Sequence, residues 1–454
     1  MAAAASKSSW PLAVIAAAGI AFFAACYYPG AMSLDSAVIW SQARGAPSTN
    51  IYGAGLRWLW QVTDPVWAGP APLFLIQLAL FWAGLALIAR ALECGLTGRI
   101  AFLLAAAFAP VVFVLLAHVW GDVMLLATLT FAVGALLRWR DGAGTGWLAT
   151  FWLSLVFAAV LRHNVLCAIV PLVVYGIWLL LKSSAISPAR KRVALVLGTL
   201  MLSFGLHAVN ALSAQCAQRR FTLWPAISMW DLTAMSIDAN QMLLPAATRK
   251  PELTLDDLRA AYVPYSNVPV FTATQGRVIG PFFLTGDPVK AALHEAWLDA
   301  VSDHPAAYFA HRWRLTRALF GVKPRDWPHE LVYADDEIAF GSNPPVAANH
   351  SVFHAATIRV AEALRDTAVL APWPYLVLGL AALAVAWRRR AQANAQAAIA
   401  VLGSGFAYAA PLPLIAPSAE LRYLGWSCLA AVIGAGLALS SAPRRTAEGE
   451  APNC

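Results

Sequence analysis

The chain has 454 residues, of which 60% are hydrophobic and only 12% are charged. Soluble domains carry roughly 25% charged residues, so this composition excludes an ordinary soluble protein. The net charge of +8 does not indicate a nucleic-acid partner, because the basic residues fall in short loops between apolar runs and form no single patch. The six cysteines include no CxxC pair and no metal-ligand spacing.

Ten apolar segments are candidates for membrane-spanning helices, since about 20 apolar residues are needed to cross a bilayer. They cover residues 10–28, 71–92, 100–117, 121–137, 147–161, 164–181, 193–212, 368–387, 396–414 and 421–440. We interpret the first segment as a retained helix and not as a cleaved signal, because similar apolar runs continue through the chain. The predicted fold class is an all-α polytopic membrane protein with about ten transmembrane helices.

Basic residues in the loops predict the orientation of these helices. With the N-terminus inside, the inner loops hold fourteen of them: Lys7, Arg90, Arg99, Arg138, Arg140, Lys182, Arg190, Lys191, Arg192, Arg388, Arg389, Arg390, Arg444 and Arg445. The short outer loops hold four: Arg44, Arg57, Arg162 and Arg422. The positive-inside rule therefore predicts a multi-pass protein of the inner (plasma) membrane with both termini in the cytoplasm.

This topology divides the chain into three parts. An N-terminal membrane module of about seven helices covers residues 1–212, and includes an outer loop at 29–70. An outer, periplasmic and α-rich segment covers residues 213–367, and a C-terminal module of about three helices with a short tail covers 368–454. In the first loop, residues 52–67 (YGAGLRWLWQVTDPVW) predict a helix lying in the membrane interface, or alternatively a plain connecting loop.

Two helices are predicted within the outer segment. Pro288 suits the first helical position, so one helix is expected from Asp287 to about Ser302. Pro305 ends it, and a second helix is expected to about Phe320.

Asp35 is the first candidate for chemistry, just past the outer end of the first span. A carboxylate at the membrane surface can act as a general base on an attacking hydroxyl, or it can bind a divalent cation. The alternative is structural, with Asp35 as the N-cap of a helix that begins SAVIWSQA.

Two further polar groups fall in tight outer turns. Arg162, His163 and Asn164 suit an anion such as a lipid phosphate, and the alternative is a solvated hairpin. His118 and Asp122, four residues apart, suit a shared proton or metal ion, although two ligands alone are weak evidence for a metal site.

Two more groups complete the set of candidates. His311, Arg312 and Arg314 lie on the second predicted outer helix, and either hold a pyrophosphate or face anionic headgroups. The last group comprises Glu420, Arg422 and Tyr423. It suits the binding of a phosphate or a sugar, and the alternative is an interface anchor. The acidic run at residues 335–337 is interpreted as a solvated face.

All five groups share the outer face in one topology. Short loops force polar residues outward, so this convergence supports a common site without proving one. One carboxylate with several cations at a membrane surface suits a phosphate-bearing lipid donor.

Three stretches resemble the GT-C fold glycosyltransferases, and within them the bacterial group related to protein O-mannosyltransferases and aminoarabinose transferases. YPGAMSLDSAVIWSQA resembles their first outer loop, AWLDAVSDHPAAYFAHRWRLTRALFG is similar to an outer-face helix, and SAELRYLGW resembles a Glu-x-Arg-Tyr segment. The chain departs from these relatives at Ser36, where many carry a second acid, and it lacks their His-Pro in the first loop.

The resemblance implies an enzyme that moves a sugar from a polyprenyl-phosphate carrier to a hydroxyl acceptor on a lipid, glycan or protein. Asp35 would be the catalytic residue, and Arg422 and Tyr423 would lie near the donor phosphate. No cofactor is certain, and a divalent cation stays open. The alternatives are a transporter or flippase of lipid-linked sugars, which predicts internal repeats and broken helices, and a non-catalytic scaffold of envelope assembly.

Overall fold

The computed structural model describes residues 10–182, 184–280, 286–322, 324, 339–347 and 349–440. Within these ranges the chain is helical, with isolated β-bridges and no strand. The helices of the first half are α1 (Trp10–Tyr27), α2 (Leu34–Ala43), α3 (Ala54–Thr63), α4 (Ala71–Ala91), α5 (Leu96–Ala107), α6 (Pro110–Leu115), α7 (Gly121–Arg140), α8 (Thr145–Ala159), α9 (Leu166–Lys182) and α10 (Pro188–Gln215). Those of the second half are α11 (Trp224–Ala239), α12 (Leu255–Ala261), α13 (Val268–Thr272), α14 (Asp287–Asp303), α15 (Pro305–Leu319), α16 (Val352–Leu364), α17 (Pro372–Arg388), α18 (Ala393–Ala409), α19 (Leu412–Ile415) and α20 (Gly425–Leu439).

Six helical stretches in the described ranges are long and apolar enough to cross a membrane. They are Trp10–Tyr27, Ala71–Ala91, Gly121–Arg140, Pro188–Gln215, Ala393–Ile415 and Leu421–Leu439. Together they indicate an all-α membrane protein, as the sequence predicted. Helices form in all ten predicted segments, but α5, α8, α9 and α17 are shorter than a full span.

The third predicted span, residues 100–117, is not one continuous helix. α5 ends at Ala107, and α6 begins at Pro110 after Ala109 adopts an extended ψ of 122°. Pro110 causes this break, because a proline lacks the N–H needed within a helix and disfavours helical geometry in the residue before it.

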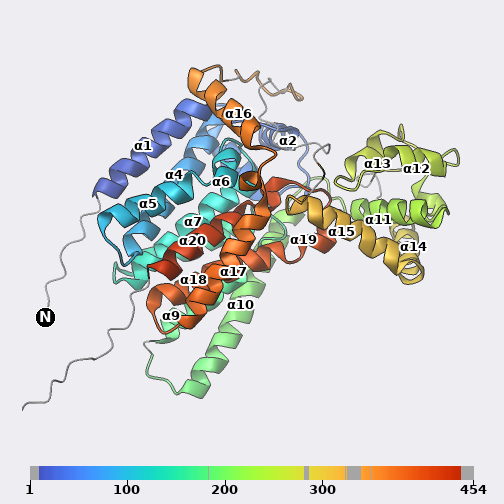
Figure 1. The fold of residues 1–454 in the computed structure, drawn as a ribbon. Helices are drawn as coiled ribbons and strands as arrows, with labels where there is room; N and C mark the ends of the chain where they lie inside the picture. The colour runs from blue at the N-terminus through green and yellow to red at the C-terminus, as the bar shows by residue number, and fades with distance from the viewer. Residues whose placement is uncertain are drawn as a thin grey trace, which may run out of the picture.

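The helices pack as a bundle of roughly parallel rods (Figure 1). α7 is central, and glycines allow it to approach α4 closely: a Cβ atom on Gly84 would lie 2.6 Å from the backbone nitrogen of Phe131. α10 lies at the edge and exposes most of its apolar surface, including Leu200, Met201 and Phe204. Such exposed surface is expected where lipid covers the protein.

The predicted interfacial helix is α3, and it is shorter than expected. Its Trp60 is buried against Trp40, with ring centroids 6.4 Å apart, and donates to the carbonyl of Gly69. The backbone nitrogen of Gly55 also donates to Val160 at 2.8 Å. α3 therefore packs into the bundle, and the Trp60 ring is buried in the protein.

Helices α11 to α15 form the outer lobe, which projects from one end of the bundle (Figure 1). α14 starts at Asp287 with proline in its first turn, and Pro305 opens α15, so the two predicted helices and the break between them are confirmed. The lobe contacts the bundle through backbone hydrogen bonds from Asn267 to Pro417 and from Ala419 to Tyr265. The acidic run 335–337 lies outside the described residues.

Candidate active site

Asp35 lies in the first turn of α2, where its side chain reaches two partners. Its Oδ2 accepts from Arg422 Nη1 at 2.6 Å, and its Oδ1 accepts from the Tyr52 hydroxyl at 2.9 Å. The N-cap of α2 is Ser33, so the capping role considered for Asp35 is wrong. The side chain is 29% exposed, which leaves its carboxylate accessible to a ligand.

Tyr52 was not among the sequence candidates. Burial raises the pKa of this phenol, and the neighbouring Asp35 carboxylate raises it further. The hydroxyl therefore stays protonated and donates to Asp35. Tyr52 lies 17 residues after Asp35 along the chain, so the local sequence gave no sign of this contact.

A second group comes from the turn before α20. Arg422 Nε pairs with Glu420 Oε2, so this guanidinium joins two carboxylates. Glu420 also accepts from the Ser418 hydroxyl at 2.7 Å and from the Tyr423 hydroxyl at 3.1 Å. The Arg422 guanidinium lies over the ring of Trp120, 5.0 Å from its centroid, which fixes its plane.

Asp122 and Arg162 form the third group. The carboxylate lies in the first turn of α7, and the guanidinium lies in the turn between α8 and α9, with Nε 3.1 Å from Oδ1. The Asp122 side chain is only 4% exposed. Arg162 also lies over the ring of Tyr423 at 5.8 Å, which joins this pair to the second group.

Hydrogen bonds hold α2 against the segment before α7 and so position Asp35. Ser36 Oγ donates to the Val119 carbonyl at 2.8 Å, and Trp120 Nε1 donates to Ser33 Oγ at 2.8 Å. The backbone of Ala31 pairs with this segment on both sides. These bonds fix the start of α2 on the bundle.

The three groups line a narrow cleft at one end of the bundle, with a volume of about 10 Å³. That is about the space that one water molecule needs, so a substrate enters only if side chains move. The cleft is lined by Asp35, Ser36, Ile39, Tyr52, Gly53, Leu56, Trp120, Gly121, Asp122, Leu161, Arg162 and Arg422. Three carboxylates, counting Glu420, face two guanidiniums, so the ionised cluster carries one net negative charge.

Other candidates near the cleft have structural partners. His163 Nε2 lies 2.8 Å from the Asn50 carbonyl, and Asn164 hydrogen-bonds Tyr408. The His118 ring is buried and stacks on Trp120 at 4.0 Å. Asp122 pairs with Arg162, and the proton or metal ion that His118 and Asp122 were considered to share stays a prediction. Across the described ranges no three His, Cys, Asp or Glu side chains are grouped to hold a metal ion.

His311 and Arg312 belong to a different cluster in the outer lobe, centred on Asp231 of α11. Arg312 Nη2 lies 2.7 Å from Asp231 Oδ1, and His311 Nε2 lies 3.2 Å from the same oxygen. Trp297 Nε1 donates to Asp231 Oδ2 at 3.0 Å. This position does not support the predicted role of His311 and Arg312 in donor binding, because neither residue lines the cleft. Arg314 is exposed and donates to the Ala310 carbonyl of its own helix.

The sequence reasoning did not find Asp231, although this carboxylate stands between Trp230 and Leu232 in the largely apolar run of α11. Such a position in a helix that packs against neighbours is a signal of a buried partner. The cleft itself unites Asp35 with Arg162 and Arg422. Glu420 pairs with Arg422, and the Tyr423 ring contacts Arg162, so both lie beside it. Comparison of the chain with protein-family models, with curated proteins and with solved structures finds no match in any of the three.

Proposed function

We propose that this chain is a GT-C-like membrane glycosyltransferase with about ten spans. It moves a sugar from a polyprenyl-phosphate donor to a hydroxyl acceptor on the outer face of a bacterial inner membrane. The observation that carries the proposal is the partly exposed Asp35 carboxylate, paired with Arg422 at the end of an apolar bundle. A base and a phosphate-binding cation are the two groups that such a transfer needs side by side.

The distribution of basic residues supports the orientation in this proposal. Arg140 donates to the Ala393 carbonyl at 3.3 Å, and Arg389 donates to the Ala438 carbonyl at 3.2 Å. These contacts gather the loops after α7, α17 and α20 at the end of the bundle opposite to Asp35. By the positive-inside rule that end is cytoplasmic, and the cleft faces outward.

The cleft geometry suggests how the reaction begins. Arg422 now holds Asp35, and it is also the nearest cation for an incoming phosphate. A phosphate that takes over Arg422 leaves Asp35 bonded only to Tyr52, which makes the carboxylate a better proton acceptor. Donor binding would thereby activate the base.

The transfer itself balances in one displacement. Asp35 accepts the proton of the acceptor hydroxyl while the oxygen forms a bond to the anomeric carbon. The bond from that carbon to the phosphate oxygen breaks, and its electron pair leaves with the phosphate. Arg422 and Arg162 stabilise the developing charge. One base and no covalent carboxylate correspond to inversion, by analogy with glycoside hydrolysis.

The net negative charge of the cluster is relevant to whether the site binds a divalent cation. Asp122 and Arg162 neutralise each other, so Asp35 and Glu420 share Arg422 and keep an excess carboxylate. Mg²⁺ commonly binds one or two carboxylates together with substrate phosphates. Asp35 and Glu420 fit that mode only with the donor present, and a cation there would offset the charge of the phosphate.

The test is sugar transfer in membranes from cells that express the full chain, supplied with radiolabelled polyprenyl-phosphate sugars. Asp35→Asn should lower transfer by roughly 10²–10⁴-fold, the usual contribution of general base catalysis. Asp256→Asn is the matched control, because that carboxylate is exposed in the outer lobe and pairs only locally with Arg259. Equal protein levels are checked by immunoblot.

Full activity of Asp35→Asn would rule out this base. If wild-type membranes transfer no sugar to a broad set of hydroxyl acceptors, the flippase and scaffold alternatives gain weight. A flippase moves the labelled carrier across sealed vesicles without bond cleavage, whereas a scaffold does neither.

A further inference from the structure

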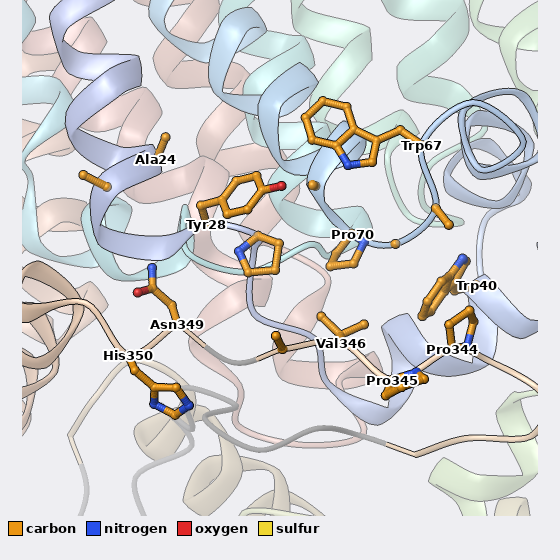
Figure 2. A pocket seen from close by; sticks show the side chains of 16 residues that line it. Ala24, Tyr28, Trp40, Trp67, Pro70, Pro344, Pro345, Val346, Asn349 and His350 are labelled. Atoms are coloured by element: carbon orange, nitrogen blue, oxygen red, sulfur yellow. The ribbon is translucent and has the colours of Figure 1, made fainter.

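A second and larger cavity lies beside the first outer loop (Figure 2). Its volume is about 700 Å³, within the range of roughly 300–1,000 Å³ that is typical of small-molecule sites. Its walls come from the last turn of α1, from residues 67–71 and from residues 344–347, 349 and 350. Asp35 does not line it, so this cavity is distinct from the cleft.

The walls of this cavity carry no charged side chain of Asp, Glu, Lys or Arg. Four prolines and five alanines line it, with the half-exposed rings of Tyr28 and Trp67, whose centroids lie 6.5 Å apart. Asn349 and His350 form a small polar edge (Figure 2). An anion would find no Lys or Arg here, whereas an apolar chain would bury its surface favourably.

The cavity opens at the end of a helix that faces lipid. Ala25 lines the cavity and is exposed, and Ala18 is exposed two turns earlier on the same face of α1. Val14 and Phe22 are also exposed along this helix. A continuous apolar path therefore leads from the bilayer into the cavity.

Hydrogen bonds hold both walls in place. Asn349 Nδ2 donates to the Cys26 carbonyl at 3.1 Å, and Ser351 Oγ donates to the Ala25 carbonyl at 2.9 Å, which fixes one wall to α1. On the other wall, Asp64 accepts from Trp40 at 2.6 Å and from the Gly69 nitrogen at 3.3 Å. The cavity is therefore preformed, and a ligand need not order it.

We infer that this cavity binds an acyl chain of a bilayer phospholipid, which enters along α1. The small polar edge of Asn349 and His350 suits the ester region that separates such a chain from its phosphate. In a polyprenyl phosphate the chain joins the charged group directly, and these walls offer that charge no partner. The inference does not depend on the proposed transfer reaction, and its test does not measure activity.

The experiment places the full chain in lipid nanodiscs that contain a phosphatidylcholine with a photoreactive diazirine near the ester of one acyl chain. After irradiation, mass spectrometry locates the labelled peptides. Ala25→Phe and Ala347→Phe fill the cavity from two different segments of its lining. Ala18→Phe is the control, since it adds the same ring to the same face of α1 away from the cavity.

Wild type should be labelled at residues 67–71, 344–347, 349 and 350, and each filling variant should lower this labelling several-fold. The control should keep it. Since the two filling variants alter different walls, a folding defect in one leaves the other informative. Labelling confined to exposed α1 positions, or unchanged by filling, would overturn the inference. Displacement of the label by a small mole fraction of polyprenyl phosphate, or by a soluble oligosaccharide, would assign the cavity to that ligand instead.

Discussion

Two ionic clusters in this chain use the same residue types and differ in their access to solvent. In the cleft, Asp35 pairs with Arg422 and keeps 29% of its side chain exposed. In the outer lobe, Asp231 and Arg312 pair with 1% and 4% exposed. Residue type alone would give both pairs the same role. The buried pair of Asp231 and Arg312 is closed to ligands, however, and can only stabilise the fold. An accessible carboxylate beside a cation can also exchange its partner for a ligand.

The contacts of the outer-lobe cluster support a structural role. Asp231 contacts Arg312, His311 and Trp297, and Arg312 also donates to the Ala416 carbonyl at 3.2 Å. On the other side of the imidazole, His311 Nδ1 lies 2.9 Å from the Tyr262 hydroxyl. This network joins α11, α14 and α15 to the bundle.

The largest effect should follow from breaking the buried pair. Arg312→Met keeps most of the side-chain volume but leaves Asp231 buried with less compensation. We expect a loss of about 3–5 kcal/mol in the free energy of unfolding, measured by denaturant titration of the purified chain. Arg314→Met, two residues along the same helix and exposed, should change this free energy by less than about 0.5 kcal/mol. Equal losses in both variants would remove the distinction between the two clusters.

A smaller effect, on activity alone, should follow in the cleft from Arg422→Lys. Lysine keeps the charge but cannot join Asp35 and Glu420 as the forked guanidinium does. We expect transfer to fall by about 10²-fold, as when one transition-state donor is lost. Arg44→Lys, at the Asp64 ion pair outside the cleft, should retain transfer. If Arg422→Lys is fully active, positive charge is sufficient and the fork is not used.

The smallest effect is a pH dependence confined to the outer-lobe cluster. Burial lowers the pKa of His311 below its usual value of 6.5, although the Asp231 carboxylate opposes this shift. Below the unfolded pKa the unfolded chain binds a proton that the folded chain binds less readily, so stability is complete above about pH 6.5 and falls as the pH decreases. Thermal unfolding between pH 7 and pH 5 measures this loss, and His311→Gln should flatten it. An unchanged slope in that variant would assign the dependence to other groups.

The helices followed well from the sequence because apolar length is a local property. α14 and α15 begin and end where Asp287 and Pro305 predict, since proline acts on its own neighbours. The interrupted third span was missed for a related reason. Hydropathy alone does not register that Pro110 has no N–H, even though the residues around it remain apolar.

The pairing of charges did not follow from the sequence. Arg312 and Arg422 both lie on the predicted outer face, yet Arg312 pairs with Asp231 and Arg422 with Asp35. Nothing in the local sequence identifies Asp231 and Asp35 as their partners, because both aspartates are far away along the chain. The pairing of Asp122 with Arg162 was missed for the same reason, since the two residues are distant along the chain.

The separation of Asp35 and Arg422 by 387 positions also sets an order of events during synthesis. At roughly 5–20 residues per second, about 20–80 s pass between the translation of the two residues. Throughout that interval Asp35 has no Arg422 to neutralise it, while α4, α7 and the helices that follow them are being synthesised. The cleft is therefore among the last features to assemble, and a ribosome that stalls before the final helix releases a chain whose membrane bundle is largely made but whose site lacks its cation.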